Sequence, residues 1–184
     1  MISIPGCDLY GAPGEPVLPF KTAMVLIPYS EEVQDIQVIP GKEVYFGEFY
    51  IVPGQEPVPF SFEGPVEPTP PDDVIYNSTN IFPEEVYSKV SVQGMRGYKI
   101  LILNLYPVQY IPKTREVSYF ESMKVVVNTR ASTPNELFRG LPQDRTYVAK
   151  IVDNPEVLVT YDLAEAHKPE QSSLLDSTQQ FDYL

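Results

Sequence analysis

Residues 98–106 read YKILILNLY, and this stretch decides the fold class. Its nearly continuous apolar run fits either a buried helix or a strand covered on both faces, and periodicity alone cannot separate the two. Its β-branched and aromatic content, with Gly97 before it and Pro107 after it, favours the strand. We therefore predict a central β-strand with both faces buried.

The segments around this strand are short and rich in Val, Ile, Tyr and Phe. Residues 33–39 alternate, with Ile36 and Val38 on one face and polar side chains on the other. Residues 122–128 repeat the pattern, and their apolar face comprises Met123, Val125 and Val127. Alternation with a period of two places one face on a core and the other in water.

Prolines separate these segments. The chain has 20 prolines in 184 residues, about twice the average share of roughly 5%. Pro40-Gly41 and Pro53-Gly54 are turn dipeptides. Residues 57–71 form a Pro-rich stretch that carries Phe60 and Phe62, and we expect an extended loop there, with or without a short edge strand. Short strands between regular turn signals predict an all-β fold, either an antiparallel β-sandwich or a partly open β-barrel.

The composition changes after Asn128. Residues 131–136 indicate a helix start, with Pro134 in its first turn, while residues 148–152 and 156–161 indicate two late strands. From Asp162 onward the chain is polar and too poor in apolar residues to fold alone. We expect a β-rich domain over residues 1–152 and a flexible connector over residues 153–184.

The charge of the chain argues against some classes of binding partner. The chain has 13 Lys and Arg against 25 Asp and Glu, a net charge of −12. Phosphates and anionic membranes demand basic residues, so the sequence argues against nucleic acid and membrane-surface partners. No apolar run approaches 18 residues, so no membrane span is expected.

The inventory of reactive side chains predicts no catalytic, metal or cofactor site. A single Cys and a single His are too few for a structural zinc site. Cys7 lacks a neighbouring base and indicates an incidental thiol, and His167 lies in the polar tail. No dinucleotide-binding or P-loop motif is present.

Paired carboxylates keep an acidic hydrolase open as an alternative. Glu31-Glu32, Asp72-Asp73 and Glu84-Glu85 all fall at turn-like positions, where solvated charge is the commoner role. A second alternative is a carbohydrate-binding or adhesive β-sandwich. Its stacking platform would comprise Tyr45, Phe46, Tyr50 and Phe60.

Basic residues are scarce, and three occupy predicted turns. Arg96 precedes Gly97 and the central strand, while Lys113 and Arg115 lie at the tip of a hairpin between Ile111 and Val117. Each is either an exposed turn charge or a protruding side chain that enters an acidic pocket on a partner.

Three stretches together resemble the propeptide domain of gingipain-type, caspase-like cysteine peptidases. Residues 11–28, GAPGEPVLPFKTAMVLIP, resemble the opening of the family. Residues 82–127 resemble its central block, in which YPVQY at 106–110 is the most specific element. The final FDYL, residues 181–184, is similar to the first strand of the family's peptidase domain, to which the connector would lead.

This resemblance implies a function. Such propeptides are β-rich, assist folding of their secreted or cell-surface peptidase, and cover its active-site cleft until they are cleaved. A basic residue on a propeptide loop occupies the primary specificity pocket of an Arg- or Lys-directed enzyme. Arg96 is favoured because it lies in the family-like block, with Lys113 and Arg115 as rivals. The catalytic residues belong to the peptidase domain, so this chain is expected to be inert, and the processing positions would be among Arg139, Arg145, Lys150 and Lys168.

Overall fold

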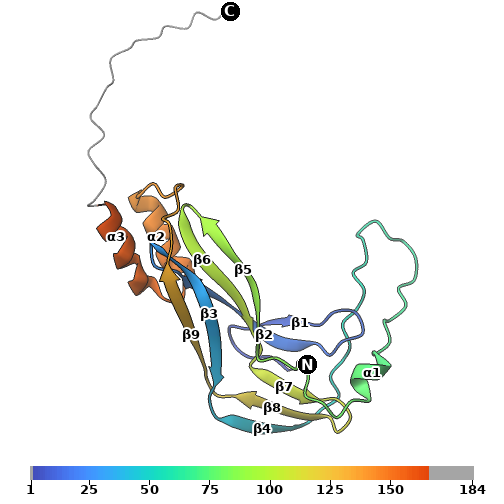
Figure 1. Cartoon of the computed structure of the whole chain (residues 1–184). Helices are drawn as coiled ribbons and strands as arrows, with labels where there is room; N and C mark the ends of the chain where they lie inside the picture. The colour runs from blue at the N-terminus through green and yellow to red at the C-terminus, as the bar shows by residue number, and fades with distance from the viewer. Residues whose placement is uncertain (1, 166–184) are drawn as a thin grey trace, which may run out of the picture.

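Strand β6 (Tyr98–Leu105) is the predicted central strand, and it lies inside a four-stranded antiparallel sheet in the computed structural model, which describes residues 2–165. The other strands of this sheet, in the order β1-β2-β6-β5, are β1 (Asp8–Tyr10), β2 (Leu18–Leu26) and β5 (Tyr87–Met95). Residues 1 and 166–184 are outside the described part, including His167, Lys168 and the final FDYL. Figure 1 shows the arrangement.

Both faces of β6 are covered. Tyr98 and Ile100 pack into a cluster with the C-terminal helices, whereas Leu101, Leu103 and Leu105 pack into a cluster with strands β3 and β9. Successive strand residues point to opposite sides, so one strand contributes to two cores. The prediction of a central strand buried on both faces is confirmed.

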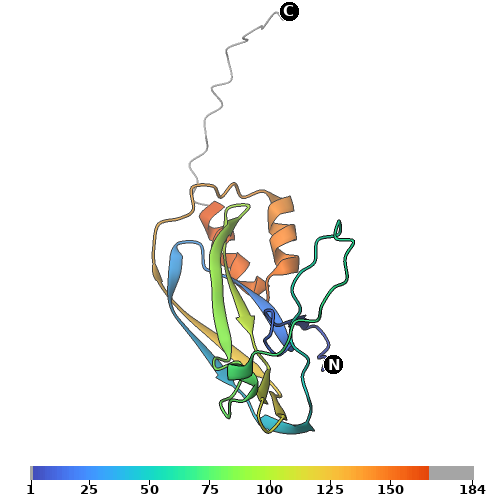
Figure 2. The ribbon, with the colours of Figure 1, turned by 90° about the vertical axis from the view of Figure 1, so that its right-hand side faces the viewer.

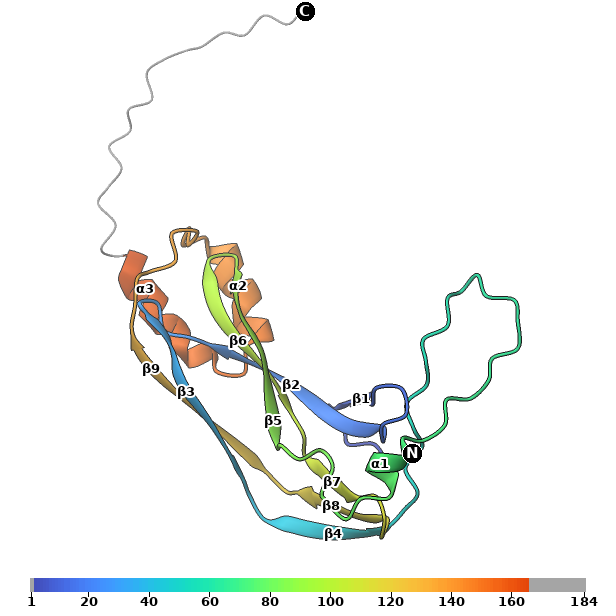
Figure 3. The same ribbon diagram turned by 45° about the vertical axis from the view of Figure 1, so that its right-hand side comes forward.

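A bent antiparallel ribbon forms the second layer. Strand β3 (Glu31–Pro40) pairs with β9 (Met123–Ala131), and β4 (Glu43–Glu48) pairs with β8 (Glu116–Phe120), which also pairs with β7 (Val108–Ile111). The two sides of the ribbon remain hydrogen-bonded through the bend. The Gly41 N–H donates to the Ser122 carbonyl at 2.8 Å, and the Glu121 N–H donates to the Lys42 carbonyl at 3.0 Å. Pro40-Gly41 therefore bends a ribbon rather than closing a hairpin (Figure 3).

The predicted fold class is confirmed as an antiparallel, mostly β structure that does not close into a barrel. The inner faces of the β2–β6–β5 sheet and of the β3–β9 pair meet in one core cluster. Ile36 and Val38 face this core, and the neighbouring Asp35 and Gln37 are exposed, as the alternation predicted.

The late strands predicted at residues 148–152 and 156–161 are wrong. Helix α2 (Pro142–Ile151), a 3₁₀ turn η1 (Pro155–Leu158) and helix α3 (Val159–Glu165) occupy this region. Val148, Leu158 and Tyr161 are buried against β6. Packing on the sheet thus outweighs the weak strand preference of the Val-rich sequence. Within the connector predicted over residues 153–184, Leu158 and Tyr161 are buried and Asn154 bonds to β2.

The helix start predicted at residues 131–136 is also wrong. Strand β9 runs to Ala131, and the chain has no regular structure from residue 132 until helix α2 begins at Pro142. Proline at the first helical position needs no backbone N–H partner there, so the signal expected at Pro134 operates at Pro142 instead.

Residues 57–71 form an extended loop, as predicted, and they contain no edge strand. The loop is followed by the short helix α1 (Asp73–Tyr76). Figure 2 shows the loop projecting from the body. Within residues 2–165, none of the helices has the length and apolarity needed to cross a bilayer.

Candidate functional site

The first candidate site is the turn between β5 and β6. Arg96 and Gly97 both have positive φ, 54° and 88°, and they join Met95 directly to Tyr98. Two-residue hairpins of this hand need positive φ at both positions. Glycine is required at the second position, because a Cβ on Gly97 would lie 2.4 Å from the Cα of Phe138.

The Arg96 side chain is held by its own domain. Its Nη1 donates to Asp144 Oδ1 at 2.6 Å, and its guanidinium lies 4.4 Å from the centre of the Tyr147 ring. Arg139 donates to the other carboxylate oxygen of Asp144 at 2.7 Å. Asp144 is only 1% exposed, and the hydrogen bond from Arg96 lowers its pKa, with Arg139 acting in the same direction.

The second candidate site is the β7–β8 hairpin, at the opposite end of the molecule (Figure 1). Lys113 and Arg115 are both exposed at its tip. The hairpin is fastened through its backbone: Lys113 N–H donates to the Ser78 carbonyl at 3.1 Å, and Arg115 accepts from Phe49 N–H at 2.7 Å. The Arg115 guanidinium lies 5.6 Å from the centre of the Tyr50 ring.

The structure therefore separates Arg96 from Lys113 and Arg115, which share one hairpin tip. It brings Arg96 together with Arg139, a predicted processing position, and it leaves the Lys113 ammonium outside every ion pair found within residues 2–165. Asp144 and Tyr147 were missed by sequence reasoning, because their partner lies 48 residues away from Asp144 along the chain.

The other processing positions differ in local structure. Arg139 lies in the irregular segment 132–141. Arg145 and Lys150 lie within α2, where Arg145 forms a two-point contact with Asp162 at 2.8 Å for both bonds. This contact lowers the pKa of Asp162. Lys168 is outside the described residues.

The acidic pairs have structural roles where contacts are defined. The Glu32 carboxylate accepts from Arg130 at 2.6 Å, and hydrogen bonds from Arg130 and Ser132 lower its pKa. Asp72 caps α1 by accepting from the backbone N–H groups of Val74 and Ile75 at 2.8 and 3.1 Å. Residues 2–165 contain no group of three or more side chains arranged to hold a metal ion.

The exposed aromatic rings near β4 pack on one another at an angle. Phe46 and Phe49 stack at 5.3 Å with 27° between planes, and Tyr50 tilts by 44° against Tyr76. A sugar platform requires side-by-side coplanar rings, and these described pairs do not form one.

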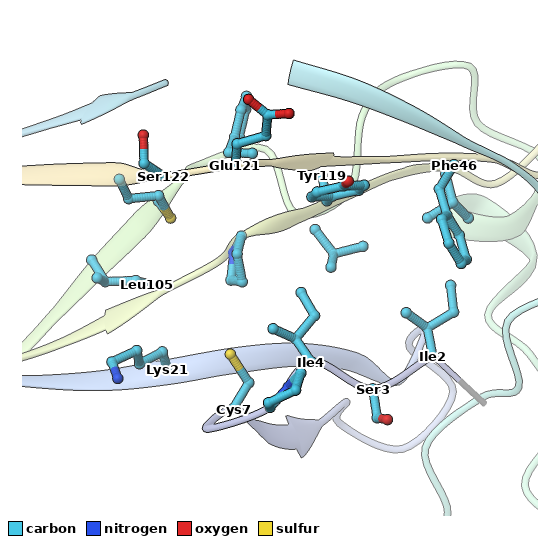
Figure 4. A pocket seen from close by; sticks show the side chains of 16 residues that line it. Ile2, Ser3, Ile4, Cys7, Lys21, Phe46, Leu105, Tyr119, Glu121 and Ser122 are labelled. Carbon is cyan, nitrogen blue, oxygen red and sulfur yellow. The ribbon is translucent and has the colours of Figure 1, made fainter. Parts of the chain in front are cut away.

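A cavity of about 520 Å³ lies where the ribbon bends (Figure 4). Its walls are mainly apolar side chains, such as Ile4, Val108 and Tyr119, and Cys7 lies at one wall near Lys21. Burial raises the pKa of the Cys7 thiol, which keeps it protonated and agrees with an incidental role.

Comparisons with known proteins agree on one class. The family model Propeptide_C25 matches residues 1–144. The solved complex of the pro- and mature domains of RgpB from Porphyromonas gingivalis shares the fold at a TM-score of 0.62 and 18% identity, covering 82% of this chain and 77% of that one. A structure of gingipain K from the same organism, described as an insight into zymogenic latency, is similar at a TM-score of 0.58 and 21% identity. The match covers 70% of this chain and 73% of that one. No curated protein matches.

Proposed function

This chain belongs to the Propeptide_C25 family, the propeptides of gingipain-type cysteine peptidases, and we propose that it keeps such a peptidase latent by covering its active-site cleft. The partner is a caspase-like peptidase domain of the same precursor, secreted or on the cell surface. The propeptide supplies no catalytic group, needs no cofactor, and assists folding of the peptidase domain. The connector predicted over residues 153–184 would lead to that domain.

The observation that carries the proposal is the basic tip of the β7–β8 hairpin. Lys113 and Arg115 protrude on a turn whose backbone is fixed by hydrogen bonds to Ser78 and Phe49. A fixed tip loses little freedom when it enters a pocket. A buried carboxylate at the bottom of such a pocket would form a charge-assisted hydrogen bond with either side chain.

Arg96 is less suited to this role than its place in the family-like block suggested. To enter a pocket, its guanidinium would first have to leave Asp144 and the Tyr147 ring. Asp144 would then remain buried with only Arg139 as its ion-pair partner among the described contacts. Losing a partner of a buried charge is unfavourable, so we assign Arg96 to holding α2 on the sheet.

Removal of the propeptide requires cleavage. Of the three candidate processing residues within residues 2–165, only Arg139 lies outside helices and strands. We therefore propose Arg139 as the first processing position in this part of the chain. Proteases bind substrates in extended conformation, and helix α2 would have to unfold before Arg145 or Lys150 could be cut.

The test is inhibition of the mature peptidase by the full chain, followed with a small substrate. We expect inhibition at micromolar concentration, weakened at least about tenfold by Lys113→Ala or Arg115→Ala, as for loss of one buried charged contact. Lys124→Ala, exposed on β9, is the matched control. Absence of inhibition by the unaltered chain would overturn the proposal, and loss of inhibition only in Arg96→Ala would return the pocket residue to the β5–β6 turn.

A further inference from the structure

The loop of residues 55–69, here called the clamped loop, has a fixed base. Thr69 N–H donates to Gln55 Oε1 at 2.9 Å, and Glu56 N–H donates to the Thr69 hydroxyl at 2.9 Å. The chain on either side is also tied to residues near the N-terminus, since Gly14 N–H donates to Gly54 O and Asp72 N–H to Gly14 O. The loop therefore leaves the body at a defined place (Figure 2).

The tip of the clamped loop presents apolar side chains to solvent. Phe60 is fully exposed, and Phe62 is 53% exposed, with Val58 and Val66 exposed beside them. Single exposed apolar residues are ordinary, but a cluster on a projecting loop typically marks an interaction site. Aromatic side chains buried at the centre of an interface contribute much of its binding energy.

The charge around this tip is of one sign. From Glu43 to Ser88 the chain has nine acidic residues and no Lys or Arg. Three of them, Glu56, Glu63 and Glu67, belong to the clamped loop itself. A partner surface must therefore offer an apolar pocket with a basic rim, because like charges across an interface are unfavourable.

The base of the clamped loop lies near the basic hairpin tip, and the loop extends away from the hairpin from there (Figure 3). The segment that carries the loop touches the hairpin on both sides: the Tyr50 ring lies under Arg115, and the Ser78 carbonyl accepts from Lys113 N–H. A partner that receives Lys113 or Arg115 is thus within reach of the loop.

We propose that the clamped loop is a second anchor for the peptidase domain, with Phe60 and Phe62 seated in an apolar pocket that is rimmed by Lys or Arg. This inference rests on the proposed function and deepens it. Four prolines at residues 57, 59, 65 and 68 restrict the free loop, which lowers the entropy lost on docking. The hairpin would supply specificity and the loop affinity.

The test is binding of the full chain to the peptidase domain with its catalytic cysteine replaced by alanine. We expect the double variant Phe60→Ala, Phe62→Ala to bind about 30-fold more weakly or worse, the loss of at least one interface anchor. Its thermal stability should be unchanged, because Phe60 and Phe62 are exposed. The control is Leu137→Ala, which is 74% exposed and lies in the segment before α2, away from the hairpin.

A second arm tests the basic rim. Glu63→Gln with Glu67→Gln should slow association at low salt by a few-fold, and the difference should shrink as salt screens the charges. Equal binding of the double Phe variant and the unaltered chain would overturn the anchor while leaving the proposed function intact. A double Phe variant that loses only self-association of the chain would overturn it too, since the loop would then bind a second copy.

Discussion

Asn154 and Leu26 exchange two hydrogen bonds, in which the Leu26 N–H donates to Asn154 Oδ1 at 2.7 Å and Asn154 Nδ2 donates to the Leu26 carbonyl at 2.9 Å. The amide side chain thus takes the place of a neighbouring strand. Asp153 continues the pattern, since its N–H donates to the Met24 carbonyl at 2.9 Å and its carboxylate accepts from Met24 N–H at 2.8 Å. The edge of β2 at Met24 and Leu26, beyond the part that pairs with β1, is thereby covered. This protects it from pairing with another chain.

Asn154→Ala should destabilise the domain by about 1–3 kcal/mol, because it leaves a strand N–H and a carbonyl without their side-chain partner. Urea unfolding followed by circular dichroism measures the change. Asn128→Ala, on the exposed face of β9, is the control and should change stability little. Equal losses in both variants would contradict the edge-covering role of Asn154.

The variant Asp144→Asn should lose less stability than the unaltered chain as the pH falls. The Arg96 hydrogen bond lowers the pKa of Asp144 in the folded state, so the folded state binds this proton less readily than the unfolded state. The stabilisation is therefore present above the ordinary carboxyl pKa near 3.8 and is lost as pH falls below it.

Melting temperatures measured from pH 7 to pH 2.5 test this. The unaltered chain should lose stability steeply below about pH 4, while Asp144→Asn should start lower at pH 7 and fall less. Glu84→Gln removes an exposed carboxylate and should leave the profile unchanged. A profile for Asp144→Asn parallel to that of the unaltered chain would contradict the assignment.

Tyr161→Phe should lower stability and change its alkaline dependence. The Tyr161 hydroxyl donates to the Ile27 carbonyl at 2.8 Å and accepts from Lys99 N–H at 3.2 Å, so its loss should cost about 1–3 kcal/mol. Burial raises the pKa of Tyr161 to about 12. The stabilisation is complete below the ordinary tyrosine pKa of about 10 and is lost as pH rises towards 12.

Spectrophotometric titration at alkaline pH checks this prediction, with unfolding measured in parallel. Tyr161→Phe should remove one late-titrating phenol, and its stability should fall less between pH 10 and pH 12. Tyr45→Phe, at an exposed ring, is the control and should leave the stability unchanged. Tyr76 also titrates late because burial raises its pKa, so a residual late step is expected in every variant.

Limited trypsin digestion should cut after Arg139 before it cuts after Arg145 or Lys150. The segment 132–141 has no helix or strand that must open before cleavage, whereas α2 must open first. Mass spectrometry of early time points identifies the fragments, and Arg139→Gln should abolish the early one. An initial cut within α2 would show that the helix is less protected than its burial of Val148 implies.

The central sheet could be predicted from sequence because its pattern is local. Residues 98–106 contain apolar side chains for both faces, and the alternation at Ile36 and Val38 assigns their shared face without knowledge of partners. Period-two alternation depends only on the strand itself.

The helical layer and the Arg96 contact could not be predicted in this way. Val148, Ile151 and Val152 are β-branched and apolar, and their packing in the cluster of Tyr98 and Ile100 makes the helix favourable. The sequence around the turn offers Arg96 no acidic partner. Its partner, Asp144, lies on helix α2, 48 residues further along the chain. Contacts between distant elements leave no periodic signal in either segment.

The bent ribbon also sets the order of assembly during synthesis. Residues 31–48 find their partners only at residues 116–131. The first half of the ribbon must therefore wait unpaired while the 67 residues between the two halves are synthesised. Pairing across such separations is slow. Exposed β3 and β4 edges are vulnerable to aggregation in that interval, and a chaperone that shields them until β9 emerges would raise the yield of folded protein.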